Sequence, residues 1–191
     1  MKKKIFSYQQ IVLFVTSLSF CFYLLGYENF NFSNQSWLIN GDLAQYQLGW
    51  KFYQEDIWRF PLGLNPNYGI SNSSSIIYSD SIPLLAIFFK IFRSFLFEDF
   101  QYFSFWIFIC IYLQALFSFK IIYYFTKNTP YSLVSSLFFI FSTILIYRSG
   151  IHLSLTAHWL ILCYFYAQIS TVKNKDLSKH LIIYLSLLIH F

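Results

Sequence analysis

Charged residues are scarce in this chain of 191 residues, since Asp, Glu, Lys and Arg together make up only 11% of it. Hydrophobic residues make up 57%, and the mean hydropathy is +0.52. A typical soluble domain carries about 25% charged residues. This deficit excludes an ordinary soluble domain and indicates an integral membrane protein.

Cysteine is also rare, and the signatures of soluble enzymes are missing. Cys21, Cys110 and Cys163 each fall inside an apolar run, without C-x-x-C or Cys/His spacing. The chain has no Walker loop, no G-x-G-x-x-G, no H-E-x-x-H and no G-x-S-x-G. We therefore expect no disulfide and no zinc site. The net charge of +5 comes mostly from basic residues at the ends of apolar runs, which is typical of membrane topology, so we expect no nucleic-acid partner.

Apolar runs long enough to cross a hydrocarbon core of about 30 Å are abundant. The predicted spans are residues 8–27, 101–125, 131–147 and 152–170. A last run, 181–191, reaches only about 16 Å as a helix, which is half a bilayer. The expected fold is an all-α polytopic membrane protein with about four full transmembrane helices and a partial fifth. We expect residues 1–191 to form a single membrane domain, either the N-terminal part of a longer protein or the product of a broken gene.

Basic residues predict the orientation of the chain. Lys2, Lys3 and Lys4 precede the first run, and no small-x-small cleavage site follows it, which favours an uncleaved signal-anchor over a signal peptide. With the N-terminus inside, Lys127 also faces the cytoplasm, and residues 28–81 form a large extracytoplasmic loop. The many Phe, Ile and Asn residues hint at a bacterial source. The expected location is therefore the bacterial inner membrane, crossed by a multi-pass chain with a cytoplasmic N-terminus.

The outer loop contains the first candidate site residue. Asp42 is followed three residues later by Gln45, as in a capping box, and this predicts a helix of about three turns that begins at Asp42. Aromatic and aliphatic residues then repeat at helical spacing: Leu43, Tyr46, Trp50 and Tyr53. This stripe suits the membrane interface. From the pattern alone Asp42 is an N-cap, and Glu55 and Asp56 are interpreted as solvated charges.

Residues 82–97 are expected to form an amphipathic helix that lies in the outer interface instead of crossing the membrane. Asp80 or the following serine is placed to cap it, and Pro83 suits its first turn. Lys90 and Arg93 fall on one stripe of this helix. Two roles are open for the stripe: it anchors the helix to anionic lipid, or it holds the phosphate of a lipid-linked substrate.

The segment YRSGIHLSLTAHWLIL follows the third predicted span on the outer side. It contains Arg148 in a tight turn, His152 one helical turn before Thr156, and His158 about 120° around the same helix. An ionisable group in a membrane helix is costly and indicates a function. The alternative is a histidine that is bonded to a neighbouring helix.

Together these features resemble the first part of GT-C-type membrane glycosyltransferases, which have an acid in a large first outer loop, an interfacial helix and closely spaced spans. The runs GDLAQYQLGWKFYQEDIWRFPLG, YSDSIPLLAIFFK and HLSLTAHWLIL resemble more specifically an uncharacterised bacterial family of GT-C-like proteins. The resemblance extends from Gly41 to around Leu162. GT-C enzymes generally have more spans, and often a soluble C-terminal domain.

The resemblance implies a reaction and its partners. A sugar passes from a polyprenyl-phosphate donor to a hydroxyl of a glycan or lipid acceptor, on the extracytoplasmic side of the lipid membrane. Asp42 matches the loop acid and is the implied catalytic base, since an acceptor hydroxyl needs a carboxylate within hydrogen-bond reach. Asp80 is the implied second catalytic acid, which orients the acceptor or binds a divalent cation. The expected substrate-binding residues are Lys90, Arg93, Arg148 and His152.

Two other functions stay open. A transporter or flippase component for lipid-linked glycans would bind with the same loop but do no chemistry. Transporters tend to hold ionisable groups near mid-membrane and to break helices with Gly or Pro, and in the predicted spans only His158 fits that pattern. The third reading is an inactive gene fragment.

Overall fold

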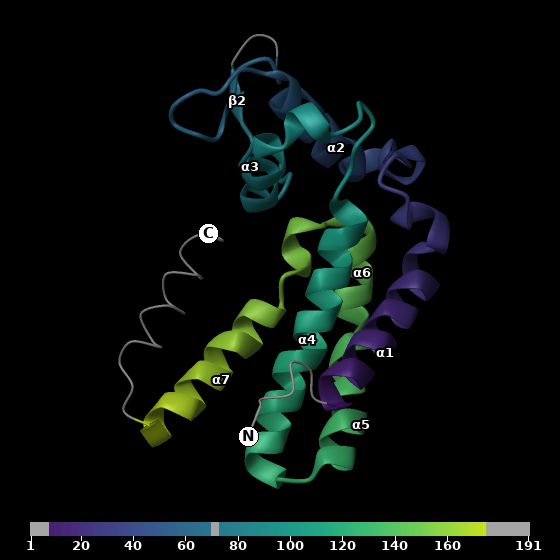
Figure 1. Cartoon of the computed structure of the whole chain (residues 1–191), viewed down its shortest axis with the longest axis vertical. Coiled ribbons are helices and arrows are strands. Elements are labelled where there is room, and N and C mark those ends of the chain that lie inside the picture. Colours follow the sequence, from purple (N-terminus) through teal and green to yellow (C-terminus); the bar gives the residue numbers. More distant parts are fainter. Residues whose placement is uncertain (1–7, 70–72, 175–191) are drawn as a thin grey trace. The chain divides into compact units, whose positions relative to one another are not determined.

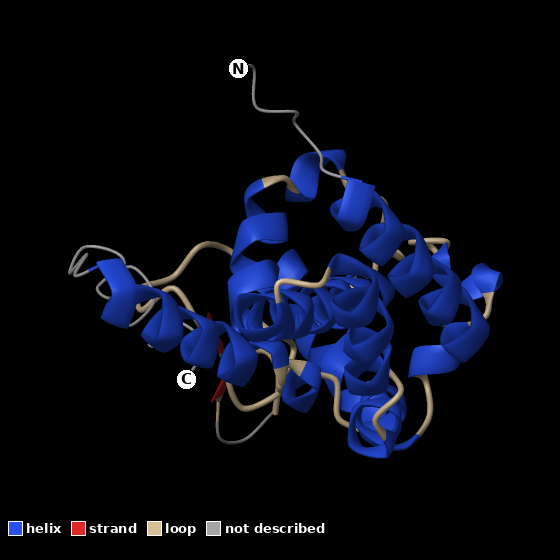
Figure 2. Ribbon diagram, turned by 90° about the horizontal axis from the view of Figure 1, so that it is seen from below, coloured by secondary structure: helices blue, strands red, loops and turns tan. Residues whose placement is uncertain are grey.

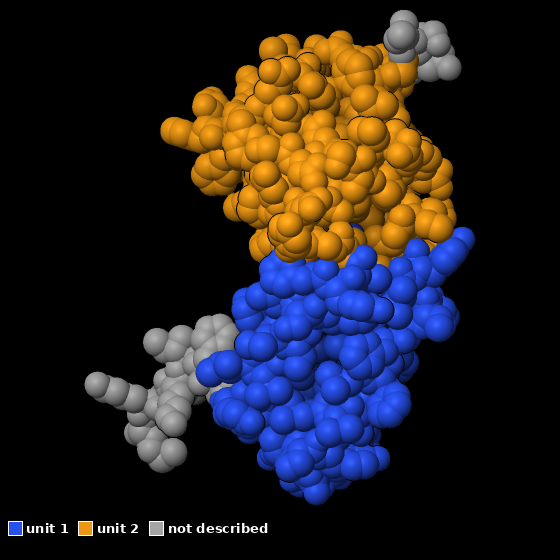
Figure 3. Space-filling model, turned by 90° about the vertical axis from the view of Figure 1, so that its right-hand side faces the viewer, with its two compact units in different colours: residues 1–24, 107–147, 156–191 blue, residues 25–106, 148–155 orange. Residues whose placement is uncertain are grey.

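The computed structural model describes residues 8–69 and 73–174, and within them α-helices dominate (Figures 1 and 2). The described strands are β1 (Leu64–Asn65) and β2 (Ser74–Ser75), which pair antiparallel. The chain divides into two compact units, which Figure 3 shows in different colours. The first unit comprises residues 1–24, 107–147 and 156–191, and the second comprises residues 25–106 and 148–155.

Two described helices are long and apolar enough to cross a membrane: α1 (Tyr8–Leu25) and α4 (Phe103–Thr126). The helices α5 (Thr129–Ile140) and α6 (Thr143–Ile151) pass the same test only together, and they are bent by 46° at the break between them. The described residues therefore hold two candidate spans, or three if the bent pair is one span. The prediction of about four full transmembrane helices with a partial fifth is wrong. Its last part, 181–191, lies outside the described residues.

The span predicted at 131–147 is broken by a serine. The Ser142 hydroxyl accepts the backbone N–H of Leu145 at 3.3 Å, which starts a new helix at Thr143. Serine side chains offer the backbone such alternatives to a continuous helix. Hydropathy alone does not predict this break in the helix, because the residues on both sides of it are apolar.

The helix in the span predicted at 152–170 begins later than expected. This helix, α7 (Trp159–Asn174), has 16 residues, and a 3₁₀ turn, η4 (Ser154–Thr156), precedes it. The carbonyl of Leu153 accepts the indole N–H of Trp106 at 2.7 Å, so this carbonyl is engaged outside any helix. The sixteen residues of α7 that the structure describes reach about 24 Å, compared with a hydrocarbon core of about 30 Å.

Aromatic contacts join the helices of the first unit. The Phe14 ring of α1 meets the Phe108 and Tyr112 rings of α4 edge to face, with centroids 5.3 and 5.8 Å apart. On α4, Phe117 stacks on Trp159 of α7 with the centroids 6.1 Å apart. The phenylalanine-rich composition thus supplies the packing between apolar helices.

The second unit is built around the aromatic stripe of α2 (Gly41–Glu55). Tyr46, Trp50 and Tyr53 are buried, so the prediction that this stripe lies at the membrane interface is wrong. The Trp50 indole donates to the Phe100 carbonyl at 2.9 Å, and its ring meets the Tyr102 ring with centroids 5.1 Å apart. The stripe is the core of this unit because the residues before α4 fold back onto α2.

The amphipathic helix predicted at 82–97 differs from the one observed. The observed helix, α3 (Pro83–Ile91), is followed by a 3₁₀ turn, η3 (Arg93–Phe95). Pro83 lies in the first turn as predicted, but Ile82 is the N-cap, at φ +52°, and no side chain caps the helix. Of the stripe for which a lipid or a phosphate partner was expected, Lys90 is buried inside the second unit and Arg93 is half-buried.

Candidate functional site

Asp42 lies in the first turn of α2. Gly41 has a φ of +58°, a left-handed conformation that suits glycine, and it turns the chain from the extended Asn40 into the helix. Because α2 begins at Gly41 with Asn40 at the cap position, the predicted N-cap role of Asp42 is wrong. Gln45, the expected partner in a capping box, donates to the Tyr78 carbonyl at 3.0 Å instead. The Asp42 carboxylate still has a favourable position near the positive end of the helix dipole.

His152 lies just beyond the end of α6. Its backbone N–H donates to the carbonyl of Arg148 at 2.8 Å, which completes the last helical turn. The indole of Trp106 holds the next residue, Leu153, by its carbonyl. His152 is therefore on a fixed turn, and not inside a membrane helix as the sequence predicted.

The structure brings Asp42 and His152 together. The Nδ1 atom of His152 is 3.8 Å from Oδ2 of Asp42, which makes an ion pair when the imidazole is protonated. The Asp42 side chain is 62% exposed and that of His152 is 34% exposed, so both reach solvent. An open cavity of about 300 Å³ lies beside them, lined by Asn40, Gly41, Asp42, Leu43, Gly150 and Ile151. A carboxylate in the wall of a cavity, with an imidazole close to it, can accept and deliver a proton.

Asp80 and Tyr46 interact with the same pair. Partial burial raises the pKa of Asp80, and the charge of His152 opposes that rise. Burial also raises the pKa of Tyr46; the carboxylates of Asp80 and Asp42 add to the rise, and a hydrogen bond with Ser154 opposes it. Asp80 has a φ of +53°, and such non-glycine outliers cluster at functional sites. Both predicted catalytic acids thus lie within electrostatic range of Tyr46.

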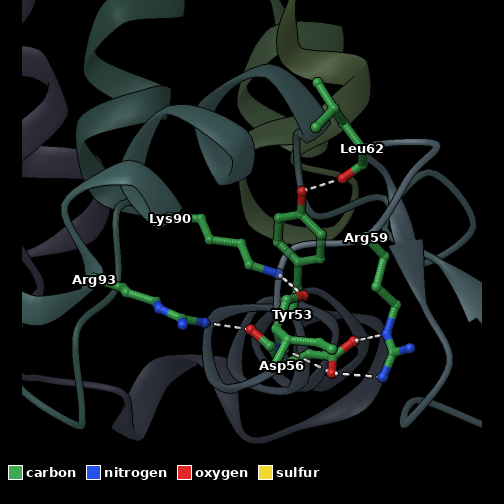
Figure 4. A network of polar contacts seen from close by, with 7 residues as sticks. Tyr53, Asp56, Arg59, Leu62, Lys90 and Arg93 are labelled. Atoms are coloured by element: carbon green, nitrogen blue, oxygen red, sulfur yellow. Dashed lines mark hydrogen bonds and ion pairs between the residues drawn. The ribbon is translucent and has the colours of Figure 1, made fainter.

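Lys90 and Arg93 belong to a different cluster (Figure 4). The Lys90 side chain donates to the Ile57 carbonyl at 3.2 Å and lies 3.8 Å from the centre of the Tyr53 ring. Lys90 is only 1% exposed, and this burial lowers its pKa to about 8. The Arg93 guanidinium donates to the Asp56 carbonyl. The two cations that were predicted to bind a phosphate hold α3 and η3 to the end of α2 instead.

The sequence interpretation of Asp56 as a solvated charge is wrong. Asp56 is buried, and it accepts two hydrogen bonds from Arg59, at 2.7 Å from Nε and 3.1 Å from Nη2. These bonds lower the pKa of Asp56. The i,i+3 spacing of the pair was visible in the sequence, but its burial depends on α3 and could not be read there.

Arg148 and His158 are the remaining basic candidates. Arg148 is half-buried in α6, two positions before Gly150 of the cavity wall. His158 falls in the first unit, apart from the candidate site residues of the second. No three His, Cys, Asp or Glu side chains gather as a metal site anywhere in the part of the chain that the structure describes. Sequence reasoning missed Tyr46, whose place in an aromatic stripe had pointed to the membrane.

Comparison with known proteins identifies a family. The model of a family described as "Domain of unknown function (DUF6311)" matches residues 14–191, which is most of the chain. No curated protein and no solved structure matches it.

Proposed function

The chain belongs to the DUF6311 family, and we propose that it is a GT-C-like glycosyltransferase. It transfers a sugar from a polyprenyl-phosphate donor to a hydroxyl of a glycan or lipid acceptor. The observation that carries this proposal is the 3.8 Å approach of His152 to the Asp42 carboxylate beside an open cavity. The two candidate spans support a membrane location, for which we propose the bacterial inner membrane with the N-terminus in the cytoplasm and the cavity outside.

In the proposed reaction Asp42 is the general base. Its carboxylate takes the proton of the acceptor hydroxyl while the oxygen forms a bond to the anomeric carbon of the donor sugar. The bond from that carbon to the phosphate oxygen breaks, and its electron pair leaves with the polyprenyl phosphate. His152 orients the Asp42 carboxylate, and Asp80 orients the acceptor.

A cation is needed where negative charge develops on the leaving phosphate. Lys90 donates to the Ile57 carbonyl and Arg93 donates to the Asp56 carbonyl, so we assign this role to Arg148. Its planar guanidinium suits a phosphate, to which it can donate two parallel hydrogen bonds. The sequence offered Lys90, Arg93 or Arg148 for the phosphate, and the proposal keeps Arg148.

Sugar transfer by the full chain in lipid nanodiscs tests the proposal. A panel of labelled polyprenyl-phosphate sugars is offered with membrane glycans as acceptors, to the wild type and to Asp42→Asn. We expect Asp42→Asn to lower the rate about 100-fold or more. The matched control is Glu55→Gln, which removes an exposed carboxylate at the other end of the same helix and should leave the rate unchanged. Equal rates for Asp42→Asn and wild type, or no transfer of any sugar by the wild type, overturn the proposal.

A carrier for lipid-linked glycans is the second candidate function. The observation that favours it is the 46° bend between α5 and α6, since transporters often build binding sites from broken helices. A flipping assay with a fluorescent lipid-linked glycan in proteoliposomes separates the two functions. A carrier moves the glycan in Asp42→Asn as in wild type and transfers no sugar.

A further inference from the structure

The segment between α2 and β1 presents large apolar side chains to solvent. In residues 57–62, which we call the apolar loop, Phe60 is 89% exposed and Trp58 is 43% exposed. Ile57 and Leu62 are also exposed. Single exposed apolar residues are ordinary on a protein surface, but a contiguous group marks a binding surface.

The backbone of the apolar loop is held at both ends (Figure 4). At its start, the carbonyls of Asp56 and Ile57 accept hydrogen bonds from Arg93 and Lys90. At its end, the Tyr53 hydroxyl donates to the Leu62 carbonyl. Helices α2 and α3 thus fix the frame of the loop. The Trp58 ring lies 5.1 Å from Nζ of Lys90 and keeps part of its surface exposed. A surface whose backbone is already ordered loses little conformational entropy when it binds.

The charges of the loop select the chemistry of its partner. Its sequence, IWRFPL, contains no acid, and its one charge is Arg59. The nearest carboxylate in that network, Asp56, is buried and paired with Arg59. The loop therefore offers aromatic rings, together with a half-exposed guanidinium that is paired with Asp56. Aromatic and basic side chains of this kind lie at the lipid–water interface, where the rings enter the acyl boundary and the cations meet phosphates.

We propose that the apolar loop inserts Trp58 and Phe60 into the lipid interface of the bilayer in which this chain resides. Along the chain, the second unit is continuous with both candidate spans, since α1 ends at Leu25 and α4 begins at Phe103. The loop is therefore tethered through the chain to both candidate spans, whereas a protein partner or a second copy of the chain must be supplied. The proposal is independent of any catalytic activity.

Depth-dependent fluorescence quenching tests the insertion. The full chain is reconstituted, one copy per nanodisc, in phosphatidylcholine and phosphatidylglycerol that carry bromine near the headgroup end of the acyl chains. The chain has five tryptophans, so the signal of Trp58 is the difference between wild type and Trp58→Phe. Trp50→Phe is the matched control, because Trp50 is fully buried. A gain-of-signal variant, Phe60→Trp in the Trp58→Phe background, places the reporter at the most exposed position of the loop.

We expect Trp58→Phe to lower the fraction of fluorescence that the brominated lipid quenches, Trp50→Phe not to lower it, and Phe60→Trp to restore it. Aqueous acrylamide should quench the Phe60→Trp reporter less in nanodiscs than in lipid-free detergent. Two results overturn the proposal. One is an unchanged quenched fraction in Trp58→Phe together with free access of acrylamide to Phe60→Trp. The other is protection of the reporter only when several copies share one membrane, which assigns the loop to contacts between chains.

Discussion

The Nδ1 atom of His152 and the Oδ2 atom of Asp42 lie 3.8 Å apart, although the two residues are far from each other in the sequence. Asp42 is at the start of α2, and His152 follows the end of α6. Tyr46 of α2 interacts with Ser154 of the same turn, which adds a second link between these two elements. The pair can work as one unit because both side chains are fixed on ordered backbone.

The first prediction is that the two residues are coupled in activity and nearly independent in stability. Since Asp42 is mostly exposed, the pair should contribute only about 0.2–1 kcal/mol to the free energy of unfolding. If His152 acts through Asp42, His152→Gln should lower sugar transfer in the wild type and have little further effect in Asp42→Asn. A double-mutant cycle on transfer rates checks this. Additive losses would show that His152 acts on the substrate directly.

The second prediction concerns Trp106, whose indole donates to the Leu153 carbonyl at 2.7 Å. Trp106→Phe keeps an aromatic ring but removes this hydrogen bond, which should cost about 1 kcal/mol. The turn that carries His152 should then open more often. Hydrogen–deuterium exchange in Trp106→Phe should rise in residues 152–156 and stay unchanged in α2. The control is Trp50→Phe, which breaks the hydrogen bond to the Phe100 carbonyl instead. In this control, exchange should rise in α2 and stay unchanged in residues 152–156.

The third prediction is that Gly49 cannot carry a side chain. A Cβ at this position overlaps the Ser79 hydroxyl and comes within 2.6 Å of Oγ of Ser81, and both serines are buried. Gly49→Ala should lower the stability of the chain by about 1–3 kcal/mol, as overpacked sites do. Gly150→Ala is the control, since nothing lies within 4 Å of the added Cβ. A thermal midpoint of Gly49→Ala that equals the control would contradict the close packing of α2 on this segment.

The fourth prediction is a pH dependence that Lys90 causes. Burial lowers the pKa of Lys90 from 10.5 to about 8, so above about pH 8 the unfolded chain holds more protons than the folded one. Stability should therefore rise with pH in this window. In Lys90→Met, which has a similar volume and no charge, this rise should be absent. Thermal midpoints at about pH 7.5 and about pH 9.5 check the sign, below the range in which ordinary tyrosines titrate. If the thermal midpoint of the wild type fell with pH as much as that of Lys90→Met, folding would not lower the pKa of Lys90.

Helical periodicity predicted α2 well and its surroundings poorly. The repeat of Tyr46, Trp50 and Tyr53 identified a helix and one apolar face, and both are observed. The same repeat was assigned to the membrane interface, because periodicity shows that a face is apolar without showing what covers it. The apolar face of α2 is covered by Phe100 and Tyr102, which lie in the segment just before α4.

Composition and the lengths of the apolar runs were enough to predict helices fit for a bilayer, because hydropathy is a local sum over neighbouring residues. That reasoning located α1 and α4, and it did not predict the break between α5 and α6, where the Ser142 hydroxyl starts a new helix. Only the tertiary structure decided which charged groups meet. It placed His152 beside Asp42 and Asp80, and it buried Lys90 against Tyr53 and the Ile57 carbonyl. A charge is stabilised by groups that surround it in space, and these groups lie far from it in the sequence.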